Sequence, residues 1–142
     1  MNAEPRKALY SPQMLALAVE LAAVPYDAAA PYVGEARSRS CGSVLRLSTS
    51  GECRDLGLSV QACAVGQASA GIFARHCEGK TSTDLASTLA EIEAWLAGPA
   101  DIPDWPDFDL VEPARDFPGR HGAILLPWRA ALDALSKTGT QG

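Results

Sequence analysis

The sequence predicts an α+β domain in two layers, with a small antiparallel sheet packed against helices. Three observations carry this prediction. A helical pattern comes first in the chain, an alternation of apolar and polar residues follows over residues 43–61, and helical patterns then return up to residue 135. An order of helix, short sheet and further helices is typical of the α+β class.

The composition fits a single domain, which we expect to span residues 1–142. The 142 residues are 47% apolar and 20% charged, enough to bury one core of ordinary size. The net charge of -5 comes without a basic cluster, so nucleic acid is not an expected partner. The longest apolar stretch, residues 15–24, is too short to span a bilayer, and the start of the chain lacks the layout of a secretion signal. These features predict a cytoplasmic protein without a membrane partner.

The first predicted element is a helix that starts at Pro12 and runs to about Val24. Ser11 before Pro12 is typical of a helix N-terminus, because serine caps the first turn and proline fits the first helical position. Apolar residues at helical spacing then share one face. Residues 25–31 show no period and are expected to form a loop.

Residues 43–61 are predicted to form an antiparallel hairpin with one buried face. The alternation of apolar and polar residues runs over residues 43–48, breaks at a turn over residues 50–52, and resumes over residues 55–61. Residues 34–40 have a weaker apolar signal and are predicted as a third strand.

Two helices are predicted directly after the hairpin. The first begins after Cys63 with a run of small residues, which lets a helix lie close to the sheet, and stops at Gly79. The second begins behind the cap candidates Ser82 and Thr83 and ends at Gly98.

A long connection and a last helix complete the predicted core. Residues 100–119 are rich in proline and aspartate and are predicted as an irregular connection, anchored by Trp105 and Phe108. Apolar residues at helical spacing then predict a helix over residues 125–135 that packs against the same core.

The spacing of the four cysteines, Cys41, Cys53, Cys63 and Cys77, indicates no metal site by itself, since it contains neither a CxxC pair nor a zinc-finger pattern. In a cytoplasmic protein such cysteines are expected to be reduced thiols. Cys63 stands at a predicted helix start, where unpaired N–H groups favour a negatively charged thiolate suited to metal binding or sulfur acceptance. The alternative is a buried thiol that acts as a small apolar residue.

Five segments follow one another in an order that resembles a known family. They are Leu9-Tyr10-Ser11, Cys41-Gly42-Ser43, residues 62–70, Gly79-Lys80-Thr81 and residues 117–128. Together they resemble the U-type iron-sulfur cluster assembly scaffolds, namely the NifU N-terminal domain, IscU and, for the last segment most closely, SufU. The resemblance implies a SufE/NifU-like scaffold fold. It also raises the possibility that residues 126–128 touch a partner protein, although we favour a core position for them.

The resemblance implies a site in which three cysteines, helped by an aspartate or histidine, hold zinc or a nascent cluster. Cys41 and Cys63 fall on the first two cysteine positions. The third falls on Ala123, and the motif aspartate is replaced by Ser43. Neither replaces the lost ligand, because a methyl group has no lone pair and a serine hydroxyl stays protonated near neutral pH. His121, two positions before the lost cysteine, is the candidate third ligand.

We therefore expect a degenerate, non-enzymatic scaffold that weakly binds zinc or an iron-sulfur cluster through Cys41, Cys63 and His121. Its expected partners are a cysteine desulfurase or other iron-sulfur assembly proteins of a bacterial cytoplasm. Two alternatives stay open: a metal-free interaction or regulatory module of the same fold, and a thiol sulfur carrier that uses Cys63. Cys53 and Cys77 are expected to lie outside the site, since the intervening helix separates Cys77 from Cys63 by about 20 Å.

Overall fold

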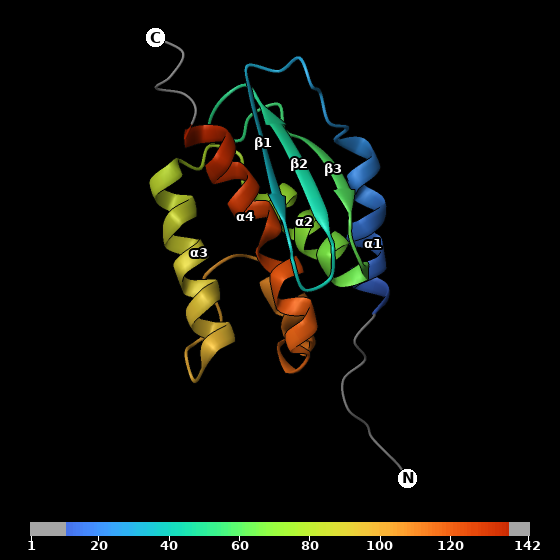
Figure 1. Cartoon of the computed structure of the whole chain (residues 1–142), viewed down its shortest axis with the longest axis vertical. Helices are drawn as coiled ribbons and strands as arrows, with labels where there is room; N and C mark the ends of the chain where they lie inside the picture. The colour runs from blue at the N-terminus through green and yellow to red at the C-terminus, as the bar shows by residue number, and fades with distance from the viewer. Residues whose placement is uncertain (1–10, 137–142) are drawn as a thin grey trace.

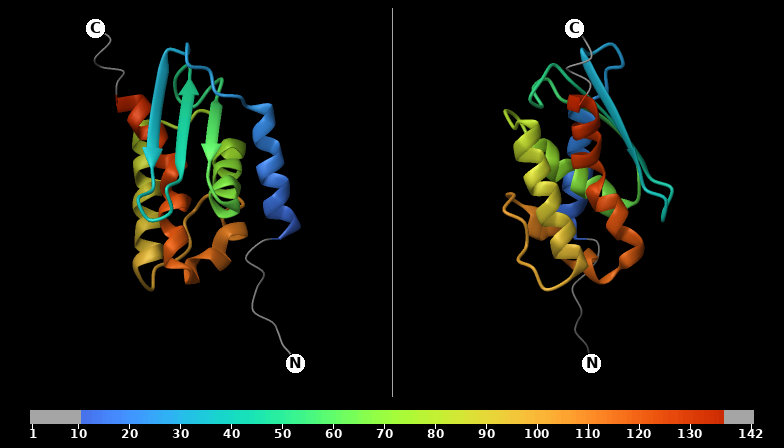
Figure 2. Two further views of the ribbon diagram at one scale, coloured as in Figure 1. Left: turned by 45° about the vertical axis from the view of Figure 1, so that its right-hand side comes forward. Right: turned by 60° about the vertical axis from the view of Figure 1, so that its left-hand side comes forward.

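A two-layer architecture is present in the computed structural model, which describes residues 11–136. A three-stranded antiparallel sheet in the order β1-β2-β3 forms one layer, and helices α2 and α4 lie behind it (Figure 1). Viewed from the side, the sheet and the helices are separate layers (Figure 2). The predicted α+β class is confirmed. Within the described residues, no helix has both the length and the apolar character needed to cross a membrane.

The elements follow the predicted order, with η denoting a 3-10 helix. They are α1 (Pro12–Glu20), η1 (Leu21–Ala23), β1 (Tyr32–Arg37), β2 (Val44–Thr49), β3 (Gly57–Gln61), α2 (Ala64–His76), α3 (Ser82–Ala97), η2 (Phe108–Asp116), η3 (Pro118–Arg120) and α4 (His121–Ser136). Leu9 and Tyr10, which carry part of the family resemblance, lie outside the described residues.

The first helix and the first strand differ from the prediction at their ends. α1 begins behind the predicted Ser11 cap, but it gives way to the 3-10 helix η1 after Glu20 instead of continuing to Val24. β1 starts and ends earlier than the predicted range 34–40. Its end comes earlier because the chain already turns at Ser38, as described below.

The cap of α3 and the connection after this helix also differ from the prediction. α3 begins behind Thr81 and not behind Ser82 or Thr83, because Thr81 and Asp84 form a capping box in which each side chain accepts a hydrogen bond from the other residue's backbone N–H. The connection over residues 100–119, predicted to be irregular, contains η2 and the start of η3.

Aromatic side chains fill the centre of the core between the layers. Trp128 of α4 meets Phe73, Trp105 and Phe108 edge to face, with ring centroids 5.3, 5.1 and 5.9 Å apart. Trp105 and Phe108 are buried, as predicted for anchors of the connection. Leu126 and Trp128 are both 0% exposed. The alternative that residues 126–128 touch a partner protein is therefore wrong.

Small residues bring the backbones of neighbouring elements unusually close together. A Cβ atom at Gly34 of β1 would collide with the Ala130 carbonyl oxygen and the Ala134 backbone of α4, reaching 2.9 Å from the Ala134 Cα. A Cβ atom at Gly71 of α2 would lie 2.7 Å from the Leu17 carbonyl oxygen of α1. The small residues of α2 were predicted to allow close packing on the sheet. At Gly71 they allow close packing against helix α1.

α4 also satisfies a hydrogen-bond donor of β1. Glu35 pairs with Arg46 of β2, and its backbone N–H donates to the Asp133 Oδ2 of α4 at 2.9 Å. The helix is therefore held along this strand both by close packing and by a charge-assisted hydrogen bond.

We expect Gly34→Ala to lower the free energy of unfolding by about 1–3 kcal/mol, because the added methyl group collides with backbone atoms that cannot rotate away. Urea denaturation followed by far-ultraviolet circular dichroism measures this change. Gly98→Ala is the matched control, since a Cβ atom at Gly98 meets no atom within 4 Å. Equal stability of the two variants would contradict the close packing of β1 on α4.

Candidate thiol site at one end of the sheet

Cys41 lies in the turn that joins β1 and β2. The Ser38 N–H donates to the Ser43 carbonyl oxygen at 2.9 Å, and the Gly42 N–H donates to the Ser38 carbonyl oxygen at 2.9 Å. Gly42 has a φ of 71°, in the left-handed region that glycine adopts without strain. The Cys41-Gly42 pair noticed in the sequence is therefore part of a tight turn that requires glycine after the cysteine.

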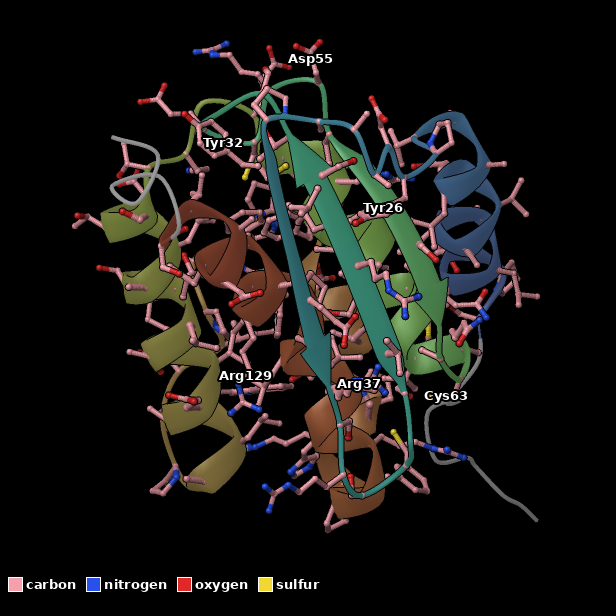
Figure 3. All side chains as sticks on the ribbon, turned by 45° about the horizontal axis from the view of Figure 1, so that its top comes forward. Tyr26, Tyr32, Arg37, Asp55, Cys63 and Arg129 are labelled. Atoms are coloured by element: carbon pink, nitrogen blue, oxygen red, sulfur yellow. The ribbon has the colours of Figure 1, made fainter. Side chains whose placement is uncertain are left out.

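Cys63 occupies the N-cap position of α2, at the same end of the sheet. The first residue of β2, Val44, pairs with the last residue of β3, Gln61, so the segments that carry the two cysteines leave the sheet at one end. Figure 3 shows that Cys63 and Arg37, the last residue of β1, both lie near this end of the sheet. The Cys63 side chain is half-buried and makes no capping hydrogen bond.

The start of α4 contacts both cysteine-bearing segments. A Cβ atom at Gly122 would lie 3.1 Å from the Ser38 Cβ, so α4 rests directly on the β1–β2 turn. The next residue, Ala123, is 0% exposed, and its Cβ lies 3.2 Å from where a Cβ atom of Gly66 in α2 would be. The position that the family resemblance assigns to a third cysteine thus lies between the helices and offers only a methyl group.

The exposed Cys41 thiol is surrounded by groups that favour its thiolate form. Its Sγ lies 2.9 Å from the Ser43 Oγ and 3.4 Å from the Ser38 Oγ. Partial burial acts to raise the pKa of Cys41, but hydrogen bonds with Ser38 and Ser43 and the positive charge of Arg120 outweigh it, and the pKa lies below the ordinary thiol value. Ser43, which replaces the motif aspartate, is therefore a hydroxyl partner of this sulfur.

Two of these neighbours, Ser38 and Arg120, were not found by sequence reasoning. Ser38 reaches Cys41 because the turn closes between Ser38 and Ser43, and Arg120 is the last residue of η3, directly before α4. No local pattern in the sequence signals either contact. Knowing the bounds of the β1–β2 turn would have been enough to find Ser38.

The His121 side chain forms a hydrogen bond with the backbone of Arg115. Its Nε2 lies 2.6 Å from the Arg115 carbonyl oxygen, so ligation through this nitrogen would break that contact. Across residues 11–136, no three or more His, Cys, Asp or Glu side chains are grouped so that they could hold a metal ion. The assignment of Cys41, Cys63 and His121 as ligands stays a prediction.

Cys53 and Cys77 lie away from this end of the sheet. Cys53 is in the turn between β2 and β3, and Cys77 follows the last residue of α2, whose first turn carries Cys63. Figure 3 shows Asp55, in the same turn as Cys53, at the end of the molecule opposite to Cys63. As predicted, the two residues are remote from the candidate site.

Comparison with known proteins identifies the fold. No family model and no curated protein matches the chain. The chain is similar to the N-terminal part of a NifU-like protein from Brucella abortus, with 28% identity, a TM-score of 0.79, and coverage of 94% of this chain and 96% of that one. A SufU protein from Fervidobacterium islandicum AW-1, described as an iron-sulfur cluster assembly scaffold for the SUF system, is 21% identical, with a TM-score of 0.74 over 89% of this chain and 96% of that one.

These similarities define an α+β protein with a scaffold fold. More specifically, the fold is that of the U-type iron-sulfur cluster assembly scaffolds, and the resemblance to NifU and SufU seen in the sequence is confirmed.

We expect the rate of Cys41 alkylation by iodoacetamide to reach half of its high-pH value at a lower pH than for an ordinary thiol. Ser43→Ala removes a hydrogen-bond partner of the thiolate and should slow alkylation near neutral pH by about threefold to tenfold, since one pKa unit corresponds to a tenfold change in thiolate. Peptide mass spectrometry at a series of pH values measures the Cys41 rate. Ser82→Ala, an exposed serine at the start of α3, is the control, and an unchanged profile in Ser43→Ala would refute the role of Ser43.

Proposed function

We propose that this protein takes part in iron-sulfur cluster assembly by weakly holding a nascent cluster or a metal ion at Cys41 and Cys63. The observation that carries the proposal is the similarity to a NifU-like protein, which extends over 94% of the chain with a TM-score of 0.79. The two cysteine-bearing segments leave the sheet at the same end, and this supports the proposal. The cluster is cargo in this role, so the protein acts as a carrier and not as an enzyme.

Weak binding follows from the number of ligands. A zinc ion or an iron-sulfur cluster is typically held by four ligands, most often thiolates in cluster sites. Cys41 and Cys63 supply two thiolates at most, and Ala123 supplies none. Sulfide, water or a partner protein would complete the coordination, which makes the cargo easy to release. A cysteine desulfurase in the cytoplasm is the proposed sulfur source and partner.

Anaerobic addition of ferrous iron and sulfide to the purified protein is expected to give a visible charge-transfer absorption that is lost in Cys63→Ser, because the serine hydroxyl stays protonated near neutral pH and does not replace a thiolate. Absence of colour in the wild-type protein would overturn the carrier proposal. If the colourless protein still bound a cysteine desulfurase, the metal-free interaction module would be favoured instead.

Restoring the third cysteine provides a gain-of-function test. We expect Ala123→Cys to bind zinc at least about tenfold more tightly than the wild-type protein, because it adds a thiolate where the start of α4 meets the cysteine-bearing segments. Competition with a chromogenic zinc chelator measures the affinity. Ala123→Ser is the matched control, with a side chain of similar size and no thiolate. Equal zinc affinity in the two variants would show that residue 123 does not face the bound ion.

A second function, as a sulfur carrier, is favoured by the exposure and lowered pKa of Cys41. In this reaction the Cys41 thiolate attacks the outer sulfur of a donor persulfide. A new S–S bond forms on Cys41, and the donor S–S bond breaks to leave the donor thiol. The exposure and the lowered pKa of Cys41 therefore move the proposed sulfur acceptor from Cys63, the residue expected from the sequence, to Cys41.

Sulfur acceptance is tested by incubating the protein with a cysteine desulfurase and free cysteine. We expect the Cys41 peptide to gain the mass of one sulfur atom, and the gain to disappear in Cys41→Ser, since the persulfide needs a nucleophilic thiolate. Cys63→Ser is the paired variant. Loss of the gain in Cys63→Ser alone would return the acceptor role to Cys63, and no gain in the wild-type protein would dismiss the function.

A further inference from the structure

The end of the molecule opposite to the candidate site holds a second pair of thiols. There the turn between β2 and β3 lies against the connection from α2 to α3. The Gly79 N–H donates to the Glu52 carbonyl oxygen at 2.8 Å, and the Arg54 Nη1 lies 3.3 Å from the Glu78 Oε2. These four residues flank Cys53 on one segment and follow Cys77 on the other, so two independent contacts hold the segments together around the cysteines.

The thiols of Cys53 and Cys77 are both buried at this end of the molecule. Their side chains are 2% and 1% exposed, neither is part of a disulfide, and both belong to the same buried core, on segments that the Gly79–Glu52 hydrogen bond joins. The neighbouring Cys77 thiol outweighs burial and holds the pKa of Cys53 below its ordinary value, whereas the Cys53 thiol, together with burial, raises the pKa of Cys77. Cys53 lies between the exposed residues Glu52 and Arg54 in the hairpin turn, so it is the thiol that a local opening of the turn uncovers, and it is assigned as the nucleophile.

The backbone at Cys53 is held in an uncommon conformation. Cys53 has a φ of 59°, and its neighbours Glu52 and Asp55 have φ values of 48° and 52°, all in the left-handed region that residues other than glycine seldom adopt. Strain of this kind persists only where surrounding contacts hold the chain in place. The contacts of this turn with Glu78 and Gly79 thus hold it in this shape.

We propose that Cys53 and Cys77 form a dithiol–disulfide site whose substrate is a low-molecular-weight disulfide such as oxidised glutathione. The Cys53 thiolate attacks one sulfur of the small disulfide, forming a mixed disulfide and releasing one small thiol. The Cys77 sulfur then attacks Cys53, the mixed S–S bond breaks, and the second small thiol leaves. The protein loses two thiol protons and two electrons, and the small disulfide gains both.

The contacts between the two cysteine-bearing segments explain why this product is intramolecular. The segments that carry the two cysteines are already joined by the Gly79–Glu52 hydrogen bond and the Arg54–Glu78 ion pair, so the Cys77 thiol is held near the mixed disulfide on Cys53. The product links the tip of the β2–β3 hairpin to the end of α2, closing the loop over residues 53–77. Closing a loop of this length is expected to raise the unfolding temperature by roughly 10 °C. Because both thiols are buried, oxidation requires a brief opening of the turn and is slower than reaction at the exposed Cys41.

The test uses the full chain carrying Cys41→Ser and Cys63→Ser, which leaves Cys53 and Cys77 as its two thiols. Incubation with oxidised glutathione is expected to give a monomer lighter by two hydrogen atoms, without free thiols and with a higher unfolding temperature that returns to the initial value on reduction. Retention of both thiols, a stable glutathione adduct or a dimer linked between chains would overturn the proposal.

Two further measurements keep the test decisive if the double variant folds poorly. In the wild-type chain, Cys41 and Cys63 are first blocked by alkylation of the folded protein, and peptide mapping after oxidation is expected to show one cross-linked peptide containing Cys53 and Cys77. The Cys77→Ala variant, treated in the same way, should stop at the glutathione adduct of Cys53 with no rise in unfolding temperature. A cross-link that joins any other cysteines would contradict the proposal.

Discussion

The close approach of α4 to both β1 and α2 decides where the other parts of the molecule lie. Glycine provides the space at these contacts: Gly34 lies against the α4 backbone, Gly66 against Ala123, and Gly122 against the β1–β2 turn. A bulkier residue at any of them would push α4 outward. The turn that carries Cys41 and the start of α2, which carries Cys63, would then no longer both contact α4. The geometry of the thiol site therefore depends on backbone packing some distance away, and not on any bond between the two cysteines.

Most of the fold could be predicted from the sequence because its strands and helices have clear apolar periods. α4 shows the limit of that reasoning. Apolar residues at helical spacing predicted that it packs against the core, but Ala130, Ala131 and Ala134 are also fully buried, and Ala130 and Ala134 lie against Gly34 of β1. Alanine is common on both buried and exposed surfaces, so its burial leaves no apolar signal. The start of α3 was misplaced for another reason, since three adjacent hydroxyl residues are all good caps and only the capping box with Asp84 selects Thr81.

The thiol site was predicted in its outline and not in its contacts. The resemblance to a known family pointed to Cys41, Cys63 and the alanine at position 123, and the structure places the segments that carry these residues together. His121 was chosen because it is close to Ala123 in sequence. Residues two positions apart on a helix do not face the same way, however, and its Nε2 contacts the Arg115 carbonyl oxygen instead. Sequence proximity is therefore a poor guide to ligands on a helix.

The hydrogen bond between Asp133 and the Glu35 backbone does more than position α4, because it also engages the edge of the sheet. β1 is at the border of the sheet, and a border strand offers free N–H and C=O groups to any extended chain that it meets. Here one of those N–H groups is already taken by a carboxylate. A strand arriving from another molecule would have to expel Asp133 and bring its own carbonyl oxygens near a negative charge. The same residue that fastens the helix thus discourages growth of the sheet into an aggregate.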